Sequence, residues 1–418
     1  MRNEYDCVVV GAGPGGAATA STVAQQGHST LLIERDPMPR FHVGESLMPE
    51  VYWPLEKLGL VERVKEAGFQ TKNSVQFVTG GGKESEPFFF KEHDERECSI
   101  TWQVERAEFD KMLYDRAQEL GADCYDRTRL LDVTFDADQR VSGVRLRDPD
   151  GEEKSVRCRV LVDATGQQSF LANKWQLKEV NPELKKAAIW GYFKNAARDP
   201  GENAGATIIL QTEAKDSWFW FIPQSRGITS IGCVGDIDYL LKGRGKPEEV
   251  FYQELEKCPG LKPRLQQAER VGSVRTIKEF SYWTKQHAGD GWVLVGDAFG
   301  FIDPVYSSGV YFALEMGVRA GEAIAEGLSR NDLSERQLGR WTAEFKDGAQ
   351  WIRKLVNVFY SKEFSVGRFL RDHPQHRGNL TDLLIGRIFY DGAGKIFDDL
   401  EPALEQAKSA RTKVESTR

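Results

Sequence analysis

Hydrophobic residues gather in short unbroken runs near the start of the chain. Residues 5–10 form one run, which ends at Gly11, and residues 30–33 form a second run, which ends at Glu34. Unbroken apolar runs of this length are typical of parallel strands that are buried on both faces. The small residues between the two runs predict a helix that stops at Gly27. The pattern therefore predicts a strand–helix–strand unit at the N-terminus.

The middle of the chain instead alternates hydrophobic and polar residues, which is typical of antiparallel strands. Residues 130–162 alternate around turn residues and predict a β-meander, and residues 185–235 are strand-like and rich in Trp, Phe and Ile. Residues 291–297 form another apolar strand, which ends on Gly-Asp. Beyond Glu315 the pattern is helical, until the polar residues 406–418 predict a frayed end.

The composition is typical of a soluble globular protein, with 40% hydrophobic and 28% charged residues. The chain has 56 Lys and Arg residues and 63 Asp and Glu residues, and the resulting formal net charge of −7 argues against a nucleic-acid-binding surface. No segment reaches the roughly 20 unbroken apolar residues of a transmembrane helix. A strand that begins near residue 5 leaves no room for a signal peptide. We therefore expect a cytoplasmic protein without a membrane span.

The cysteines stand apart from one another, without a CxxC pair or metal-ligand spacing. Several of them lie in apolar runs, so we expect buried free thiols in a reducing compartment and no metal site. The six positions are Cys7, Cys98, Cys124, Cys158, Cys233 and Cys258.

Three glycines follow the first predicted strand at the spacing of a dinucleotide-binding turn. Gly11 permits the tight turn, Gly13 lets the backbone approach a pyrophosphate, and Gly16 lets the helix pack close to the strand. The amides at the N-terminus of that helix would hold the phosphates. Glu34, at the end of the second strand, is placed to accept the ribose hydroxyls of an adenosine. This motif predicts a dinucleotide but does not separate FAD from NAD.

Two later motifs favour FAD. Residues 296–304 close a strand and lead into a helix that starts near Ser308, and they resemble the ribityl-binding Gly-Asp motif of the FAD-dependent monooxygenase-like superfamily. The resemblance implies that Asp297 binds a ribityl hydroxyl and that the helix amides face the flavin ring. Residues 104–110 resemble the Arg-x-x-Phe-Asp helix start of the same superfamily. Arg106 would then lie near the flavin, and a solvated helix arginine is the alternative.

With FAD as the cofactor, the pattern predicts an α/β fold. It consists of a Rossmann-like FAD-binding domain, an inserted antiparallel β-sheet substrate domain and a helical C-terminal region. The FAD-binding domain would be discontinuous, over residues 1–75, 101–170 and 271–330. The substrate-side sheet domain would take residues 76–100 and 171–270, and the helical region would take residues 331–418.

A tryptophan-rich strand narrows the family. Residues 217–223 read Ser-Trp-Phe-Trp-Phe-Ile-Pro and resemble the Trp-x-Trp-x-Ile-Pro signature of flavin-dependent halogenases. Alternation along a strand puts Trp218, Trp220 and Ile222 on one face. The resemblance implies that these three residues and Pro223 form a wall, which keeps the organic substrate away from the flavin. An aromatic core strand is the alternative.

Lys72 stands five positions before Phe77 and downstream of Gly44-Glu45-Ser46. This arrangement resembles the halogenase segment that contains the catalytic lysine. The resemblance implies that reduced FAD, dioxygen and a halide form hypohalous acid, which passes through a tunnel to Lys72. The lysine would hydrogen-bond the acid or form a haloamine beside the substrate. A partly desolvated amine has a lowered pKa and suits this role, whereas a surface lysine is the alternative.

Ser308 and Gly309 lie in a stretch, residues 304–310, that resembles the halogenase loop whose backbone amides hold the halide. Tryptophan halogenases carry a glutamate just before the matching Ser-Thr-Gly, where this chain has Tyr306. The departure points away from free tryptophan as the substrate. It points towards phenols, pyrroles or carrier-bound acyl groups.

We therefore expect an FAD-dependent halogenase that acts on an electron-rich aromatic of the phenol or pyrrole type. A separate flavin reductase would supply reduced FAD, because no second GxGxxG unit for NAD(P)H is visible. The other partners would be a halide ion and the aromatic substrate, either free or bound to a carrier protein. An FAD-dependent monooxygenase or a geranylgeranyl-reductase-like oxidoreductase is the alternative, and a flavin-binding protein with a decayed site is a third possibility.

The resemblance covers about residues 5–325, and the remaining tail is short for the family. An acidic carrier protein could dock on its basic residues, although a solvated helix face is the more common explanation. These residues are Arg353, Lys354, Lys362, Arg368, Arg371, Arg377 and Arg387.

Overall fold

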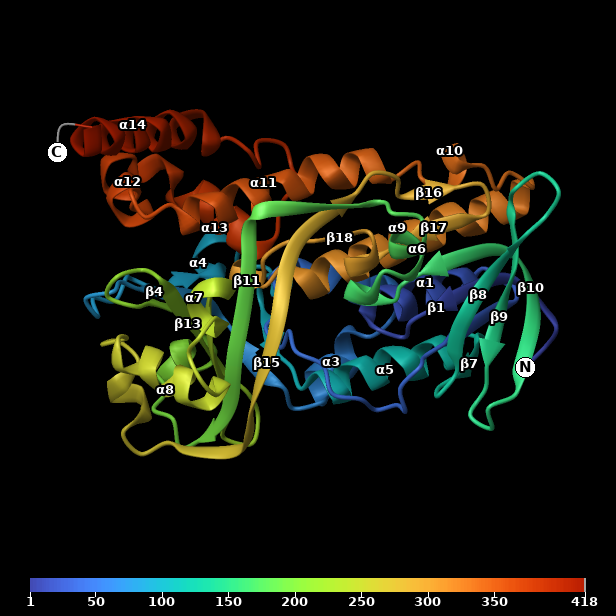
Figure 1. The fold of residues 1–418 in the computed structure, drawn as a ribbon, viewed down its shortest axis with the longest axis horizontal. Coiled ribbons are helices and arrows are strands. Elements are labelled where there is room, and N and C mark those ends of the chain that lie inside the picture. The colour runs from blue at the N-terminus through green and yellow to red at the C-terminus, as the bar shows by residue number, and fades with distance from the viewer. Residues whose placement is uncertain (417–418) are drawn as a thin grey trace.

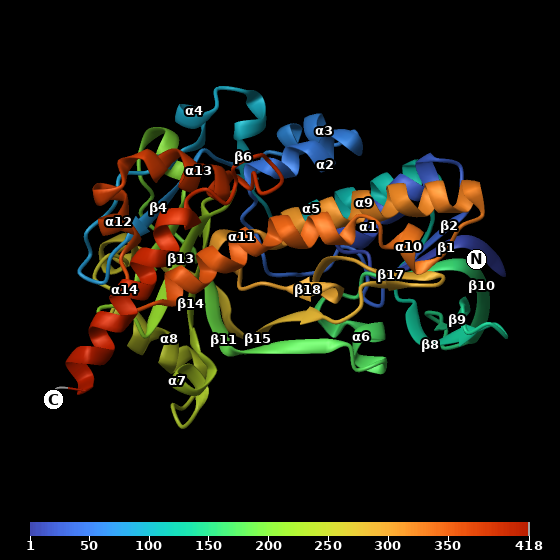
Figure 2. The same ribbon diagram turned by 90° about the horizontal axis from the view of Figure 1, so that it is seen from above.

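The computed structural model describes residues 1–416. Figure 1 shows two large sheets towards the two ends of an elongated molecule, with the helices of the last part of the chain along one side. The N-terminus lies at one end and the C-terminal helix lies at the other, as the view from above also shows (Figure 2). Within the described residues, no helix is long and apolar enough to cross a membrane. The cytoplasmic location stays a prediction.

The sheet near the N-terminus is built around parallel strands. Its members in chain order are β1 (Glu4–Val10), β2 (Thr30–Ile33), β7 (Asp123–Tyr125), β8 (Arg129–Phe135), β9 (Val141–Arg147), β10 (Glu153–Asp163), β16 (Ala288–Gly289) and β17 (Trp292–Leu294). In space the order is β16-β17-β10-β1-β2-β7, with β9 paired to β10 and β8 paired to β9. Val10 at the end of β1 pairs with Asp163 and Ile33, so the carboxyl ends of three strands meet at one edge. Ligands of open parallel sheets bind at this edge.

The structure confirms the predicted β-meander, because β8, β9 and β10 pair antiparallel in turn. The strand predicted over residues 291–297 is shorter than expected. β17 ends at Leu294, and the short 3₁₀ helix η6 (Gly296–Ala298) follows. The chain turns here because Gly296 takes the left-handed backbone conformation, with a φ of +61°, which glycine adopts without steric cost.

The second large sheet is mostly antiparallel. Its strands are β4 (Ser74–Val78), β5 (Phe88–Phe89), β11 (Lys178–Lys194), β12 (Thr207–Gln211), β13 (Ser217–Pro223), β14 (Ile228–Asp236), β15 (Glu269–Thr284) and β18 (Gly300–Phe301), in the spatial order β18-β15-β11-β14-β13-β12-β4-β5. A separate pair joins β3 (Gln70–Lys72) to β6 (Thr101–Gln103). The arrangement agrees with the predicted α/β class and its inserted sheet, while the domain boundaries stay a prediction.

The two faces of the second sheet bury different sets of side chains. On β13, Trp218, Trp220 and Ile222 belong to the main hydrophobic core, which continues into the first sheet. Phe219 and Phe221 point the other way, into a smaller core that helices α7 (Ile237–Leu241) and α8 (Pro247–Glu256) complete. The predicted alternation along this strand is therefore confirmed.

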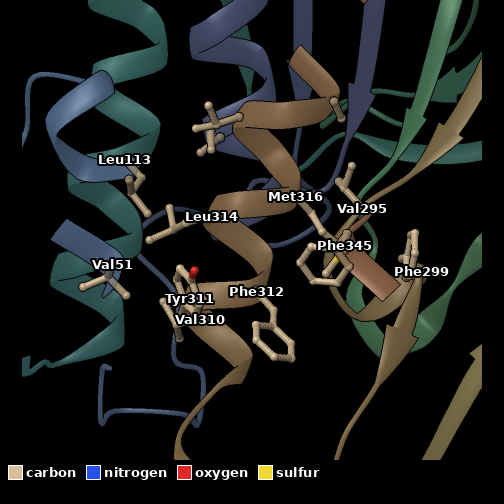
Figure 3. Packing of buried hydrophobic residues seen from close by; sticks show 14 of the residues in the cluster. Val51, Leu113, Val295, Phe299, Val310, Tyr311, Phe312, Leu314, Met316 and Phe345 are labelled. Atoms are coloured by element: carbon tan, nitrogen blue, oxygen red, sulfur yellow. The ribbon is translucent and has the colours of Figure 1, made fainter. Parts of the chain in front are cut away.

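Helix α9 (Gly309–Arg330) crosses the main core, and Figure 3 shows its apolar side chains between two groups of partners. Val51 and Leu113 lie on one side of the helix, whereas Val295, Phe299 and Phe345 lie on the other. The remaining helices are α1 (Pro14–Gln25), α2 (Tyr52–Lys57), α3 (Val61–Glu66), α4 (Phe90–His93), α5 (Arg106–Glu119), α6 (Phe170–Lys174), α10 (Glu335–Leu338), α11 (Thr342–Tyr360), α12 (Val366–Asp372), α13 (Arg377–Ile385) and α14 (Phe397–Ser416).

The prediction of a frayed end was wrong for residues 406–416, which continue helix α14. The helix is anchored at its start, where Phe397 is buried and its ring stacks on Trp351 of α11, with a centroid distance of 5.7 Å. Ala403 and Leu404 pack against the main core. Extending an anchored helix adds one hydrogen bond per residue, so polar residues of good helix propensity continue it. Residues 417–418 lie outside the described residues.

Candidate functional site

A cavity of about 330 Å³ is lined by both large sheets. Gly11, Glu34 and Asp297 line it from the carboxyl edge of the first sheet. Thr207 and Trp220 line it from one face of the second sheet. The cavity thus brings together motifs that lie far apart in the sequence.

The glycine turn at this edge leaves no room for side chains. Gly11 has a φ of +103°, and a Cβ atom there would lie 2.2 Å from the carbonyl oxygen of Ala164. A Cβ atom at Gly16 would lie 1.9 Å from the carbonyl oxygen of Gly11, so helix α1 packs directly on β1. Gly11 and Gly13 line the cavity, whereas Gly16 lies outside the lining, where α1 contacts the turn. The cradle and the N-terminus of α1, which begins at Pro14, fit a pyrophosphate.

Glu34 is buried at the end of β2, and three groups orient its carboxylate. Oε2 accepts a hydrogen bond from the Ala12 amide at 3.0 Å and lies 3.3 Å from Nε of Arg40. Oε1 accepts a hydrogen bond from the Asp36 amide at 3.1 Å. A carboxylate oxygen has two acceptor positions, so Oε1 can accept a further hydrogen bond from a ribose hydroxyl.

Arg106 lines the cavity and is only 6% exposed, so it is not a solvated helix arginine. Its guanidinium donates two hydrogen bonds to Asp110, at 2.8 and 3.0 Å. It also donates to the carbonyl oxygens of Val43 at 2.8 Å and Gly44 at 3.2 Å. The arginine therefore fixes the turn at Gly44, whose φ is +100°. The two residues after this turn line the cavity as well.

Asp297 lies in the short helix η6, which follows β17, and lines the cavity. Burial raises the pKa of its carboxyl to about 6, although the positive charges of Arg106 and Lys178 oppose the shift. No hydrogen bond within the described residues contributes to this shift. A carboxylate at the cavity lining can act as an acceptor, which would fit a donor such as a ribityl hydroxyl.

The tryptophans of β13 form one wall of the cavity, together with Ile222. The indole of Trp220 lies flat on the neighbouring strand β14, because Gly232 there has no side chain: a Cβ atom would lie 2.2 Å from the ring. Its Nε1 donates a hydrogen bond to Ser230 Oγ at 3.1 Å. The rings of Trp218 and Trp220 are tilted by 59°, with centroids 6.4 Å apart. Pro223, the fourth predicted wall residue, is buried but does not line the cavity.

Lys72 is buried at the end of β3, with 1% of its surface exposed. Its Nζ donates hydrogen bonds to Ser46 Oγ at 2.9 Å and to the carbonyl oxygen of Leu47 at 2.8 Å. Burial lowers the pKa of the amine from 10.5 to about 7, and no charged side chain contributes to the shift. The amine lies behind Ser46, which itself lines the cavity. The structure thus rules out a surface lysine.

The predicted halide loop borders the same cavity. Helix α9 begins at Gly309, which lines the cavity together with Ser307, whose φ of +62° is left-handed. Ser308 is buried at the N-cap position but does not line the cavity. The unpaired amides and positive dipole end of a long helix attract an anion at such a position. Tyr306 is buried behind the loop.

The C-terminal helices contribute to the wall, which the sequence did not reveal. Tyr360 at the end of α11 donates a hydrogen bond to Asp303 Oδ2 at 2.8 Å and accepts one from Trp218 Nε1 at 3.0 Å. Burial raises the pKa of Asp303 to about 6. Phe359 packs edge-on against the rings of Trp218 and Tyr306, at centroid distances of 5.6 and 6.2 Å. The short tail therefore supports both the wall and the halide loop.

Several basic residues of the tail have partners within the chain. Lys362 pairs with Asp216, Lys354 with Glu401 at 2.9 Å, and Arg387 with Asp94 and Asp382. Arg353 lies over the ring of Trp283 and Arg377 over that of Phe88, while Arg368 and Arg371 are exposed. These contacts agree with an ordinary charged helix surface better than with a dedicated docking site.

Sequence reasoning missed three residues that line the cavity beside Lys72. Ser46 and Thr207 lie close together, with their hydroxyl oxygens 2.8 Å apart. Glu45 accepts a hydrogen bond from the Tyr192 hydroxyl at 2.5 Å, and burial raises the pKa of its carboxyl. Glu45 and Ser46 belong to the Gly-Glu-Ser motif, which predicts no role for either residue. No pattern around Thr207 marked it.

Comparisons with known proteins identify the family of the chain. The family model for an FAD binding domain matches residues 4–345. The chain is 35% identical, over 92% of both proteins, to the 1H-pyrrole-2-carbonyl-[peptidyl-carrier protein] brominase of Pseudoalteromonas luteoviolacea. It is 26% identical, over 97% of this chain and 94% of the relative, to the 1H-pyrrole-2-carbonyl-[peptidyl-carrier protein] chlorinase of Pseudomonas fluorescens. The solved structure of the flavin-dependent brominase Bmp2 superposes with a TM-score of 0.86 at 31% identity, covering 96% of this chain and 99% of that one.

Proposed function

The chain belongs to the flavin-dependent halogenases, and we propose that it halogenates an electron-rich aromatic of the pyrrole or phenol type through Lys72. FAD is the cofactor of the family. Reduced FAD supplies hypohalous acid when dioxygen and a halide are present. A separate flavin reductase would deliver the reduced cofactor.

The observation that carries the proposal is the environment of Lys72. Its amine is desolvated, has a pKa of about 7, and reaches the cavity through a single hydroxyl, that of Ser46. A group that titrates near neutral pH can both donate and accept a proton during turnover. A lysine with a purely structural role would instead keep its charge, by pairing with a carboxylate or by reaching solvent.

The chain's own residues divide the remaining tasks. The turn at Gly11 and Gly13 would hold the pyrophosphate of FAD, Glu34 its ribose and Asp297 its ribityl chain. The N-terminus of α9 at Gly309 would hold the halide. These assignments rest on where each group lies around the cavity.

The wall would keep the flavin and the aromatic substrate in different parts of the cavity. Trp218, Trp220 and Ile222 line the cavity from one strand, and their apolar side chains would exclude water. Excluding water protects a reactive oxidant from side reactions. We propose a pyrrole-2-carbonyl group on a carrier protein as the first substrate to test, because two of the relatives are named for it.

The test compares the wild type with Lys72→Ala. The holoenzyme receives reduced FAD from an added flavin reductase, together with bromide or chloride, and acts on pyrrole-2-carbonyl-loaded carrier protein, free pyrroles and phenols. We expect a halide-dependent mass gain with the wild type and a loss of about 100-fold or more with Lys72→Ala, since acid–base groups contribute on this scale. FAD binding should not change.

Lys174→Ala is the matched control, because this lysine pairs with Asp132 at the surface and does not line the cavity. It should keep the wild-type rate. Halogenation by Lys72→Ala at the wild-type rate would remove Lys72 from the mechanism. Oxygenated product without halide dependence would instead assign the wild type to the monooxygenases.

A further inference from the structure

Four buried polar side chains form a chain of hydrogen bonds beside the cavity. Lys72 Nζ donates to Ser46 Oγ at 2.9 Å, Ser46 Oγ lies 2.8 Å from Thr207 Oγ1, and Gln103 Nε2 donates to Thr207 Oγ1 at 2.9 Å. Each of the four side chains is at most 5% exposed. Only Ser46 and Thr207 line the cavity. The amine therefore meets the cavity through this hydroxyl pair.

The two hydroxyls of this hydrogen-bond chain carry one hydrogen more than the chain has acceptors for. Ser46 Oγ accepts from the ammonium of Lys72, and Thr207 Oγ1 accepts from the amide of Gln103. The two hydroxyls own two hydrogens, and one of them forms the bond between Ser46 and Thr207. The other hydrogen has no acceptor among the residues that the structure describes and is available to the cavity. Whichever hydroxyl donates within the pair, one donor remains for a group in the cavity.

We propose that the Ser46–Thr207 hydroxyl pair relays protons between the Lys72 amine and the oxidant in the cavity. Lys72 would then act through these hydroxyls and would not form a haloamine, because its nitrogen lies behind Ser46. This inference rests on the proposed halogenase function. Ser46 would exchange the proton directly with the amine, Thr207 is the second hydroxyl of the relay, and Gln103 orients Thr207.

The step balances with hypohalous acid as the oxidant. The aromatic carbon attacks the halogen, so that a carbon–halogen bond forms and the oxygen–halogen bond breaks. The departing hydroxide takes a proton from the Lys72 ammonium through the hydroxyl pair and leaves as water. The ring carbon then loses its proton, which returns to the amine by the same route. The net reaction converts the aromatic C–H and hypohalous acid into the aryl halide and water.

The surroundings of the amine suit a group that gives and regains a proton. Ser46 and Leu47 approach it from the loop before η1 (Pro49–Val51), Thr101 pairs with Lys72 on β6, and the ring of Phe90 in α4 lies 5.9 Å from Nζ. None of these neighbours is ionisable. The pKa of about 7 comes from burial alone, so both protonation states are populated at neutral pH.

The test compares Ser46→Ala, Thr207→Val and Thr207→Ser in the holoenzyme. The assay uses reductase-supplied FAD and a pyrrole-2-carbonyl group on a carrier protein. We expect Ser46→Ala to lower kcat by about 100-fold at unchanged KM, the scale of a lost acid–base path. Free hypohalous acid, trapped by added methionine, should still form. Thr207→Val should lower kcat less than Ser46→Ala does. Thr207→Ser should have a higher kcat than Thr207→Val, because it restores the hydroxyl.

Two further readouts exclude a merely structural effect. The kcat of the wild type should rise and fall with pH around the pKa of Lys72, and Ser46→Ala should lose this dependence. Competitive acetylation of Lys72, followed by mass spectrometry without turnover, should titrate at lower pH in Ser46→Ala, because the ammonium has lost an acceptor. Thr381→Val is the matched control: it removes a buried hydroxyl in α13, outside the cavity, and should behave as the wild type.

The outcomes separate the relay from the proposed function. If Lys72→Ala abolishes halogenation but Ser46→Ala keeps the wild-type kcat and pH profile, or is faster, the relay is overturned and a haloamine takes its place. If Lys72→Ala itself halogenates at the wild-type rate, the role of Lys72 fails, and the relay fails with it.

Discussion

Replacing Lys72 by methionine should make the protein more stable while it abolishes halogenation. Methionine keeps the length and apolar stem of lysine but removes the amine, whose pKa is 10.5 when solvated and about 7 in the folded protein. A pKa difference of one corresponds to about 1.4 kcal/mol, so burying the ammonium costs about 5 kcal/mol of folding free energy. The variant also loses the hydrogen bonds to Ser46 and Leu47, which reduces its gain in stability by roughly 2 kcal/mol. We therefore expect Lys72→Met to gain about 3 kcal/mol at and below pH 7.

The pH dependence has a definite sign. Between pH 7 and 10.5 the unfolded chain keeps the proton of Lys72 while the folded protein has released it, so the wild type becomes more stable as the pH rises. The advantage of Lys72→Met should shrink by about 1.4 kcal/mol per pH unit in this window and vanish near pH 9. Thermal unfolding at fixed FAD concentration, from about pH 6.5 to about pH 9, measures the difference. Lys174→Met should show no comparable trend. A difference that stays flat with pH would show that the amine keeps its proton in the folded protein. A variant that is less stable throughout would show that burying the amine costs less than its contacts contribute.

Three further substitutions test other parts of the site. Asp297→Asn should weaken FAD binding about 10-fold at neutral pH, since a hydrogen bond to a charged group contributes roughly 1.5–3 kcal/mol. Flavin fluorescence should also show that wild-type affinity falls as the pH drops through about 6, whereas the variant stays flat. Gly232→Ala should push the Trp220 indole off the sheet, cost about 1–3 kcal/mol of stability and raise the peroxide released per halogenated product; unchanged coupling would mean that the indole is only core packing. Tyr360→Phe should raise the KM for halide with little change in kcat, because Asp303 keeps the Val305 amide but loses its side-chain donor; an unchanged halide KM would separate the tail from the predicted halide loop.

Local patterns predicted the parts of the site that depend on short stretches of chain. The glycine turn, Glu34 and Asp297 each follow a strand, and carboxyl ends of parallel strands meet at one edge, so their convergence followed from the fold class. Alternation along residues 217–223 likewise predicted which side chains share a face. The lysine was predicted from a resemblance, and only the structure showed its burial.

The missed residues depend on contacts between distant elements. Ser46 and Thr207 meet across 161 positions, and Thr207 reaches the site only because β12 pairs in parallel with β4. The hydrophobic pattern identifies strands but not which strands pair. Tyr360 closes helix α11 and gave no signal of its own, because a tyrosine at a helix end is ordinary. Residues 406–416 form a helix through the packing of Phe397, which composition alone does not reveal.

The role of the C-terminal region follows from what it contacts. Phe359 and Tyr360 hold Trp218 at the edge of the wall, and Tyr360 also reaches Asp303 beside the halide loop. In the proposed mechanism, a loose wall would let water or substrate approach the flavin, so a wall residue would need support on both faces. The end of helix α11 supports Trp218 through Phe359 and Tyr360. On the sheet itself, Gly232 leaves the space that the Trp220 indole occupies. In the proposed mechanism, the end of helix α11 would thus complete the barrier from outside, through Phe359 and Tyr360.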